Sequence, residues 1–213
     1  MRYAAEGAHL VLVARTAGGL EEIDDRVQAA GGEATLVPLE LTKAAGIDRL
    51  GAALAERFGK LDVLVGNAGE LGALSPVSHT DPRLFERVLA LNLTANFRLI
   101  RSLEPLLRAS DAGRAIFVTA SQARDRKPFW GAYAASKAAL EALVAVYAAE
   151  TSRTRLRVNL VDPGPLRTRL RAIAYPGEDP EKLAAPDAVT EAFVELAEAA
   201  CERHGEVVRV RSD

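Results

Sequence analysis

The feature that most constrains this chain is a regular alternation of short apolar runs with longer segments whose apolar residues recur every three or four positions. The apolar runs predict strands at residues 9–14, 34–41, 61–65, 115–119, 156–161 and 206–210. The longer segments predict helices over about 16–30, 42–59, 82–108, 131–151 and 187–203. Strands that alternate with helices of this length are typical of a doubly wound parallel α/β sheet, so we expect a single Rossmann-like domain.

The remaining segments are expected to be loops, apart from residues 1–7, which are typical of the end of a helix stopped by Gly7. Thr16 and Thr42 are predicted helix caps, and Pro105 is predicted to disturb the last turn of its helix. Residues 162–186 contain five prolines and few apolar residues, which indicates a surface excursion or lid.

Composition narrows the function classes. The 213 residues carry a net charge of −2, which argues against nucleic acid or an anionic membrane surface as a partner. No apolar run is long enough to span a bilayer and the first residues lack a signal-peptide pattern, so we expect a cytoplasmic protein. Cys201 is the single cysteine, and the three histidines lack ligand spacing, so no metal site is expected.

Chemically suggestive residues lie at the carboxyl ends of the predicted strands. They are Arg15, Glu40, Asn67, Ser121 and the pair Pro163-Gly164. Ligands of open parallel sheets bind at the carboxyl ends of the strands, so these residues predict a site at that edge.

Tyr133 and Lys137 lie four residues apart in a predicted helix, which puts them on one face. A nearby ammonium favours the phenolate, so we expect Lys137 to lower the tyrosine pKa toward the range of an acid/base catalyst. An ordinary helix with a packed tyrosine and a solvated lysine would have the same spacing. Asn92 within a helix and the turn Gly66-Asn67-Ala68-Gly69 are likewise compatible with either a functional or a structural role.

Taken together, these segments resemble the short-chain dehydrogenase/reductase family. Asn67-Ala68-Gly69 is similar to its Asn-Ala-Gly turn, and Asn92 to its helix asparagine. Tyr133 with Ser136-Lys137 is similar to its Tyr-x-x-Ser-Lys signature, and Asn159 through Pro163-Gly164 to Thr168 is similar to its Pro-Gly segment. The agreement in order and spacing extends from residue 8 to about residue 170.

The resemblance implies an NAD(P)-dependent oxidoreductase acting on a small carbonyl or secondary alcohol. Tyr133 would be the general acid or base, Lys137 would hold the ribose and lower the tyrosine pKa, and Asn92 would anchor a relay water. The implied cofactor-binding residues are Arg15, Glu40, Leu41, Asn67, Ala68, Gly69, Tyr133, Lys137, Pro163, Gly164, Leu166 and Thr168. The resemblance also implies a homodimer or homotetramer that pairs through the helices at 82–108 and 131–151.

The serine that polarises the substrate oxygen is a first departure from the family pattern. Counting the family's usual thirteen residues back from Tyr133 reaches Ala120, whereas Ser121 is twelve back. A loop shorter by one residue would restore Ser121 to this role, and we favour that interpretation. Thr119 is a weaker substitute.

The glycine-rich turn that receives the cofactor's pyrophosphate is a second departure. Gly18-Gly19 follow the wrong strand, and about 25 residues of the first βαβ unit are expected to be absent. The absent strand would be central. Either the recorded chain starts too late, or the protein is a cofactor-impaired or non-catalytic relative with a role in association or regulation.

Arg15 favours NADP over NAD, because an arginine after this strand can pair with the 2′-phosphate whereas an acidic residue would bind the ribose 2′-hydroxyl. Glu40 stands where the family usually has an aspartate near the adenine.

Overall fold

A computed structural model describes residues 1–210. The strands are β1 (His9–Ala14), β2 (Glu33–Pro38), β3 (Val63–Gly66), β4 (Arg114–Val118), β5 (Arg157–Asp162) and β6 (Val207–Arg209). The helices are α1 (Arg2–Ala5), α2 (Ala17–Ala29), α3 (Ala44–Phe58), α4 (Pro82–Leu89), α5 (Ala95–Ala109), α6 (Gln122–Asp125), α7 (Gly131–Thr151), α8 (Arg169–Ala174) and α9 (Thr190–Ala197). Short 3₁₀ turns lie at Val77–His79, Pro180–Lys182 and Pro186–Val189, and Ala90–Thr94 is a π turn between α4 and α5.

The strands form two separate parallel sheets. One contains β1 and β2, and the other has the order β3-β4-β5-β6. Within residues 1–210 no strand joins β1 to β3, so the division falls where the sequence predicts the absent central strand. The prediction of a parallel α/β fold is confirmed.

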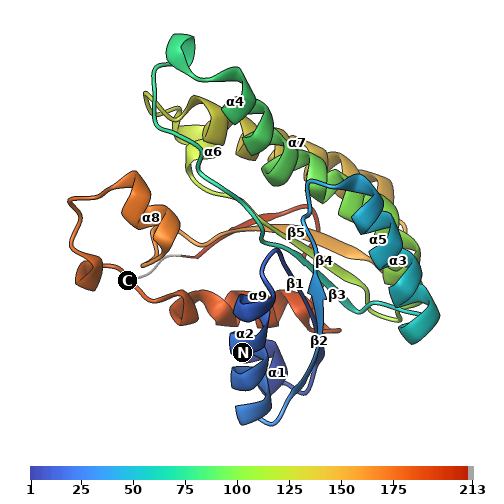
Figure 1. Cartoon of the computed structure of the whole chain (residues 1–213). Coiled ribbons are helices and arrows are strands. Elements are labelled where there is room, and N and C mark those ends of the chain that lie inside the picture. The colour runs from blue at the N-terminus through green and yellow to red at the C-terminus, as the bar shows by residue number, and fades with distance from the viewer. Residues whose placement is uncertain (211–213) are drawn as a thin grey trace.

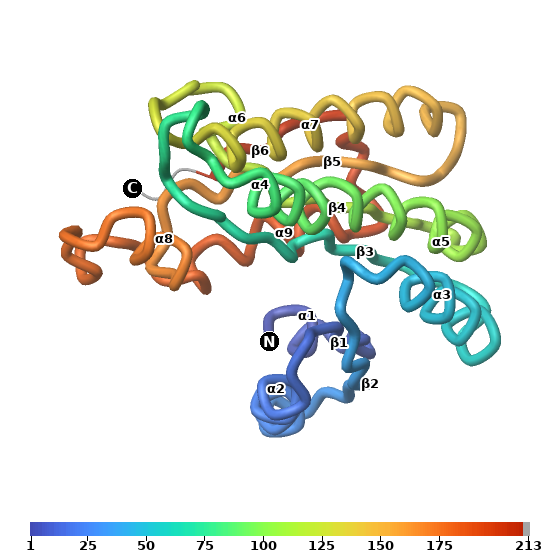
Figure 2. Tube along the Cα trace, turned by 45° about the horizontal axis from the view of Figure 1, so that its top comes forward, coloured from blue at the N-terminus to red at the C-terminus, as the bar shows by residue number. Residues whose placement is uncertain are grey.

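Helices cover both faces of the larger sheet, with α3, α5 and α7 on one side and α9 on the other (Figure 1). Successive residues of β4 alternate between these layers, as the pleat of a strand requires. Ala115 and Phe117 pack in the main core with residues of α3, α5 and α7, whereas Ile116 packs with Val161 and Leu196 toward α9. Figure 2 shows the smaller β1–β2 unit, with α1 and α2, beside this layered body.

The long helix predicted at 82–108 is continuous to Ala109 but is not uniformly α-helical. The Asp81 side chain caps its start by accepting a hydrogen bond from the Leu84 backbone nitrogen at 2.9 Å. The π turn at Ala90–Thr94 inserts an extra residue into the helical register. Pro105 lies inside α5, which continues past it to Ala109, so the proline does not end the helix.

Other boundaries differ in detail from the sequence predictions. The final helix ends at Ala197 rather than near 203, because Glu198 is extended. Thr16 precedes α2 without a capping side-chain hydrogen bond, and Lys43 rather than Thr42 precedes α3. The two site loops at 121–130 and 162–186 contain the short helices α6 and α8.

Candidate active site

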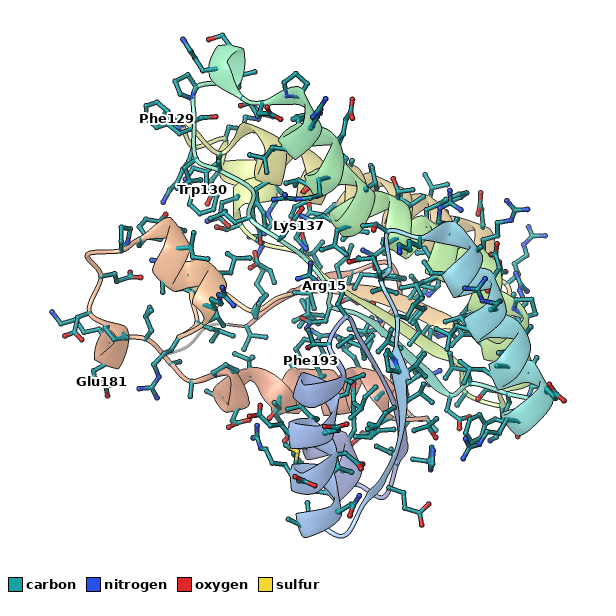
Figure 3. The ribbon with its side chains drawn as sticks, in the orientation of Figure 1. Arg15, Phe129, Trp130, Lys137, Glu181 and Phe193 are labelled. Atoms are coloured by element: carbon teal, nitrogen blue, oxygen red, sulfur yellow. The ribbon has the colours of Figure 1, made fainter. Side chains whose placement is uncertain are left out.

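Tyr133 and Lys137 lie in the first two turns of α7 and are both buried, with exposed fractions of 7% and 3%. The Lys137 Nζ atom is 5.9 Å from the centre of the Tyr133 ring. The same nitrogen donates a hydrogen bond of 2.7 Å to the Val118 carbonyl at the end of β4. The lysine is therefore directed inward at the carboxyl edge of the sheet and is not a solvated surface group (Figure 3).

Burial sets the pKa of both groups. It raises the pKa of Tyr133 to about 12, and the negative charge of Asp162 adds to this increase. It lowers the pKa of Lys137 to about 8. The expected lowering of the tyrosine pKa is therefore not seen, because desolvation of the phenolate outweighs the attraction of an ammonium that is itself desolvated. At neutral pH Tyr133 is a protonated phenol, which is the form of a proton donor.

Asn92 lies in the π turn and connects the 70–80 loop to α7. Its Nδ2 atom donates hydrogen bonds of 2.9 Å to the Glu70 carbonyl and to Ser136 Oγ, and its Oδ1 accepts one of 2.9 Å from the Glu70 nitrogen. Ser136 Oγ in turn donates to the Tyr133 carbonyl at 2.7 Å. The buried amide thus fixes the loop after β3 against the helix turn that carries the tyrosine.

The Asn67-Ala68-Gly69 turn after β3 is exposed and comes close to the lysine. A Cβ atom at Gly69 would lie 3.3 Å from Asn92 Oδ1 and 3.6 Å from Lys137 Nζ. Gly66 has a different reason to be glycine, since a Cβ there would lie 2.4 Å from Asn96 Oδ1 and 2.5 Å from Phe117. Gly69 therefore keeps the space beside the ammonium free of side-chain atoms.

The three consecutive residues Thr119, Ala120 and Ser121, at the position expected for the serine, have different surroundings. Ala120 packs in the apolar cluster that contains Tyr133. Ser121 precedes α6 and lines a cavity of about 170 Å³ with Asp162 and Gly164. Thr119 is buried and its hydroxyl donates to Glu141 Oε1 at 2.7 Å. The residue packed with Tyr133 is thus an alanine, while Ser121 lies beside the Pro163-Gly164 segment.

Arg124 on α6 forms ion pairs with Glu141 of α7 and with Asp162 at the end of β5. The other oxygen of Asp162 accepts a hydrogen bond from the Gly164 nitrogen at 3.3 Å. This network joins the three segments that surround Tyr133, and it was not among the sequence predictions. The available signals were an aspartate directly before Pro163-Gly164 and a glutamate one helical turn after Lys137.

The residues predicted to bind a cofactor divide between the two sheets. Arg15 follows β1 with 70% of its side chain exposed, and its Nε is 3.9 Å from Glu40 Oε2. Leu41 is buried in the main core. Pro163 and Gly164 follow β5, and Gly164 has a φ of +71° that favours glycine. Leu166 is buried, and Thr168 Oγ1 caps α8 by accepting a hydrogen bond from the Arg171 nitrogen at 3.2 Å.

These residues fit the two ends of a dinucleotide. The open turn at Gly69 beside Lys137 suits the nicotinamide ribose, and the exposed cation of Arg15 suits a phosphate on the adenosine ribose. No glycine-rich turn of the expected pattern occurs anywhere in the sequence to receive the pyrophosphate.

Trp130 and Tyr175 form an aromatic cluster with Tyr133. The Trp130 ring centre is 5.8 Å from that of Tyr133 and 5.8 Å from that of Tyr175. Lys127 Nζ donates to the Tyr175 hydroxyl at 3.2 Å, which ties the end of α8 to the 121–130 loop. Leu71 and Ala174 complete the cluster.

Comparison with known proteins identifies related chains. The profile of the short chain dehydrogenase family matches residues 1–179. The uncharacterized oxidoreductase YciK of Escherichia coli K12 is 37% identical over 189 residues, which cover 87% of this chain and 75% of YciK. The fatty acyl-CoA reductase of Acinetobacter baylyi is 32% identical over 173 residues, which cover 80% of this chain and 58% of that protein.

Solved structures give the same result. The structure of E. coli YciK has a TM-score of 0.94 at 34% identity, with 99% of this chain and 87% of that chain covered. A structure described as a short chain dehydrogenase of E. coli CFT073, complexed with NADPH, has a TM-score of 0.92 at 34% identity, with 99% and 89% covered.

Proposed function

Because this chain belongs to the short-chain dehydrogenase family of NAD(P)-dependent oxidoreductases, we propose that its active site is the region around Tyr133 and that it reduces a carbonyl compound or oxidises the corresponding alcohol. The observation that carries this assignment is the buried pair of Tyr133 and Lys137 at the carboxyl edge of the sheet. The nicotinamide, when bound, supplies or accepts the hydride.

Tyr133 donates the proton to the substrate oxygen during reduction. Its raised pKa keeps the phenol protonated at neutral pH, which supports the acid role in this direction. Lys137 holds the nicotinamide ribose in the space left by Gly69. Asn92 positions the helix turn that carries Tyr133 through the hydrogen bonds that join the 70–80 loop to α7.

Ser121 is our proposal for the hydroxyl that hydrogen bonds the substrate oxygen. It shares a cavity with Gly164, beside the segment assigned to the nicotinamide, which supports this role. The methyl group of Ala120, which packs with Tyr133, has no polar atom to offer. We assign Pro163, Leu166 and Thr168 to the same side of the proposed cofactor site.

Arg15 supports NADP as the preferred cofactor. Its side chain is mostly exposed and its contact with Glu40 is long, so the guanidinium is available for a phosphate. The NADPH in the related E. coli CFT073 structure is consistent with this choice. Glu40, Leu41, Asn67 and Ala68 complete the proposed adenosine and ribose contacts.

We further propose one domain over residues 1–213, of which 211–213 lie outside the described part, and a cytoplasmic location. A homodimer or homotetramer would pair through α4, α5 and α7. Among the helices of residues 1–210, none combines the length and apolar character needed to cross a membrane.

The test combines calorimetric titration with turnover. We expect NADPH to bind the 213-residue chain more tightly than NADH, and Arg15→Ser to remove that difference. Tyr133→Phe should lower turnover by about a thousandfold while changing NADPH affinity less than twofold. Full activity in Tyr133→Phe would contradict the acid role. Absence of binding heat and of a thermal shift with NADPH would instead support a non-catalytic relative.

A further inference from the structure

Asp162 is a buried carboxylate that uses both of its oxygens. It is the last residue of β5, with 5% of its surface exposed. Its Oδ2 atom forms the ion pair with Arg124, and its Oδ1 atom accepts the hydrogen bond from the Gly164 nitrogen at 3.3 Å. The two donors come from different segments, so Asp162 links the Pro163-Gly164 segment to α6.

The turn that follows Asp162 has a single backbone donor. Proline has no N–H, so in Pro163-Gly164-Pro165 only Gly164 can donate a backbone hydrogen bond. Gly164 also has the positive φ of +71°, which leaves few other residues able to replace it. The one hydrogen bond that this turn can donate goes to Asp162, which therefore controls the direction in which the chain leaves the sheet.

Arg124 anchors Asp162 to the remainder of the site. Its guanidinium also pairs with Glu141, which lies on α7 one helical turn after Lys137. Glu141 Oε1 accepts a second hydrogen bond, of 2.7 Å, from the Thr119 hydroxyl directly after β4. One arginine thus sets the position of Asp162 relative to the helix that carries Lys137.

Stability alone does not account for this network. Two carboxylates share one guanidinium, and the side chains of Asp162 and Glu141 are only 7% and 19% exposed. Removing charges from water carries a desolvation cost that apolar side chains of similar volume avoid. The buried charges therefore point to a role in the geometry of the turn that Asp162 holds.

We propose that Asp162 is a positioning residue of the active site: anchored by Arg124, it holds the Gly164 turn where the nicotinamide binds. The proposal rests on the proposed function, which assigns Pro163 and Gly164 to the nicotinamide side. Asp162 acts through Gly164 and not on the reacting atoms. Only a carboxylate serves here, because the side chain must accept from two donors at two different oxygens.

Asp162→Asn and Glu141→Gln are a matched pair of variants, since each removes one negative charge from the same network. Glu141 accepts from Arg124 and Thr119 with the same oxygen, so Glu141→Gln keeps both hydrogen bonds. The side chain of Asp162→Asn has one oxygen for two donors. That oxygen turns to the charged guanidinium, which is the stronger donor, and the Gly164 N–H then loses its acceptor.

Exchange of the Gly164 amide hydrogen, followed by NMR, tests the positioning role without a ligand. In Asp162→Asn we expect this amide to exchange about tenfold faster than in the original protein, whereas Glu141→Gln should change its rate less than about twofold. An unchanged rate in Asp162→Asn would overturn the proposal, and so would an equal acceleration in Glu141→Gln. If Asp162→Asn does not fold, Arg124→Lys tests the same link and should accelerate the same amide, because lysine lacks the fixed fork that bridges two carboxylates.

Calorimetry then tests whether the position of the turn matters for the nicotinamide. We would titrate each variant with NADPH and with adenosine 2′,5′-bisphosphate, which has the phosphate proposed to bind Arg15 but no nicotinamide. Asp162→Asn should weaken NADPH binding about tenfold and bisphosphate binding less than about twofold, and Glu141→Gln should change neither by more than about twofold. Unchanged NADPH affinity in Asp162→Asn, or equal weakening of both ligands, would overturn the proposal.

The positioning role and the proposed function fail in different ways. NADPH that binds neither the original protein nor its variants would contradict the proposed function, while the exchange of the Gly164 amide would still show whether Asp162 holds the turn. NADPH binding and turnover that are the same in Asp162→Asn and in the original protein would contradict only the positioning role.

Discussion

The two sheets of this protein are built from similar apolar strands but differ in how deeply those strands are buried. All six residues of β1 remain at least partly accessible, whereas four of the five residues of β4 and five of the six of β5 are buried. Within residues 1–210, both β4 and β5 have a strand on each side, whereas β1 pairs only with β2. An apolar run is therefore buried as a strand to the extent that its neighbouring strands are present.

The same division separates the two halves of the proposed chemistry. Tyr133, Lys137 and Ser121 are attached to the larger sheet, whereas Arg15 is attached to the smaller one. The smaller unit contacts the other body through its strands and through α1. Val11, Val13 and Val37 of β1 and β2 pack against the main core. In α1, the Tyr3 hydroxyl donates to the Phe193 carbonyl of α9 at 2.8 Å and Arg2 pairs with Glu191. The proposed proton transfer therefore lies on the better-buried region, and the proposed phosphate recognition on the more accessible one.

The largest effect is expected for substitution of Arg124, which tests how much its ion pairs stabilise the region around the larger sheet. Arg124→Met leaves the carboxylates of Glu141 and Asp162 without their cation, so we expect a loss of about 3 kcal/mol in the free energy of unfolding. Urea denaturation at neutral pH measures it. The matched Arg126→Met, in the same loop, should change stability by less than about 0.5 kcal/mol, and equal losses in the two variants would remove the special role of the network.

The next effect tests whether Ser121 supplies the hydroxyl that binds the substrate oxygen beside Tyr133. Ser121→Ala should lower kcat about a hundredfold if Ser121 binds the substrate oxygen, because a donor aimed at developing charge is lost. Ala120→Ser should then change kcat little. The reverse pattern, with an unaffected Ser121→Ala and a faster Ala120→Ser, would show that the position next to Tyr133 lacks its hydroxyl.

Lys137→Met should stabilise the protein by about 2 kcal/mol at pH 7 while abolishing turnover. Removal of the buried charge stabilises the folded chain by more than the loss of the hydrogen bond to Val118 destabilises it. The pKa of Lys137 is about 8 in the folded chain and 10.5 for an ordinary solvated lysine, so the unfolded chain binds more protons between these two values. The stability of the original protein therefore rises with pH through this window. The advantage of the methionine variant should shrink accordingly, and denaturation at pH 7 and pH 10.5 checks this.

The smallest effect compares the same substitution in the two regions. Tyr3→Phe removes the hydrogen bond to Phe193 and should lower the stability of the smaller unit by about 1 kcal/mol. Tyr147→Phe in the main core should be neutral or stabilising, because the buried Tyr147 hydroxyl has no hydrogen-bond partner among residues 1–210. Amide hydrogen exchange measures both effects. In Tyr3→Phe we expect faster exchange in β1 and β2 than in the original protein, and in Tyr147→Phe we expect no faster exchange in β4.

Sequence patterns predicted the elements well where local signals are strong. The bounds of β1 and α7 match the structure, because an apolar run and a long helical stripe are local properties. The ion pairs of Arg124 were not predicted, because the sequence shows Glu141 and Asp162 but not that the fold brings both carboxylates to this arginine. The tyrosine pKa was predicted in the wrong direction, because spacing reports a neighbouring charge but not the burial of both groups.

The π turn at Ala90–Thr94 lets this helix hold one residue more than a regular α-helix along the same path. Because the wider turn absorbs the extra residue, deleting one residue of the turn would restore a regular helix with α4 and α5 still in register. The packing of α4 on α7 and of α5 on α3 would then be kept, whereas a shift of Asn92 along the helix would break its hydrogen bonds to Glu70 and Ser136. A single-residue deletion in this turn is therefore expected to disturb the site more than the packing of the helices.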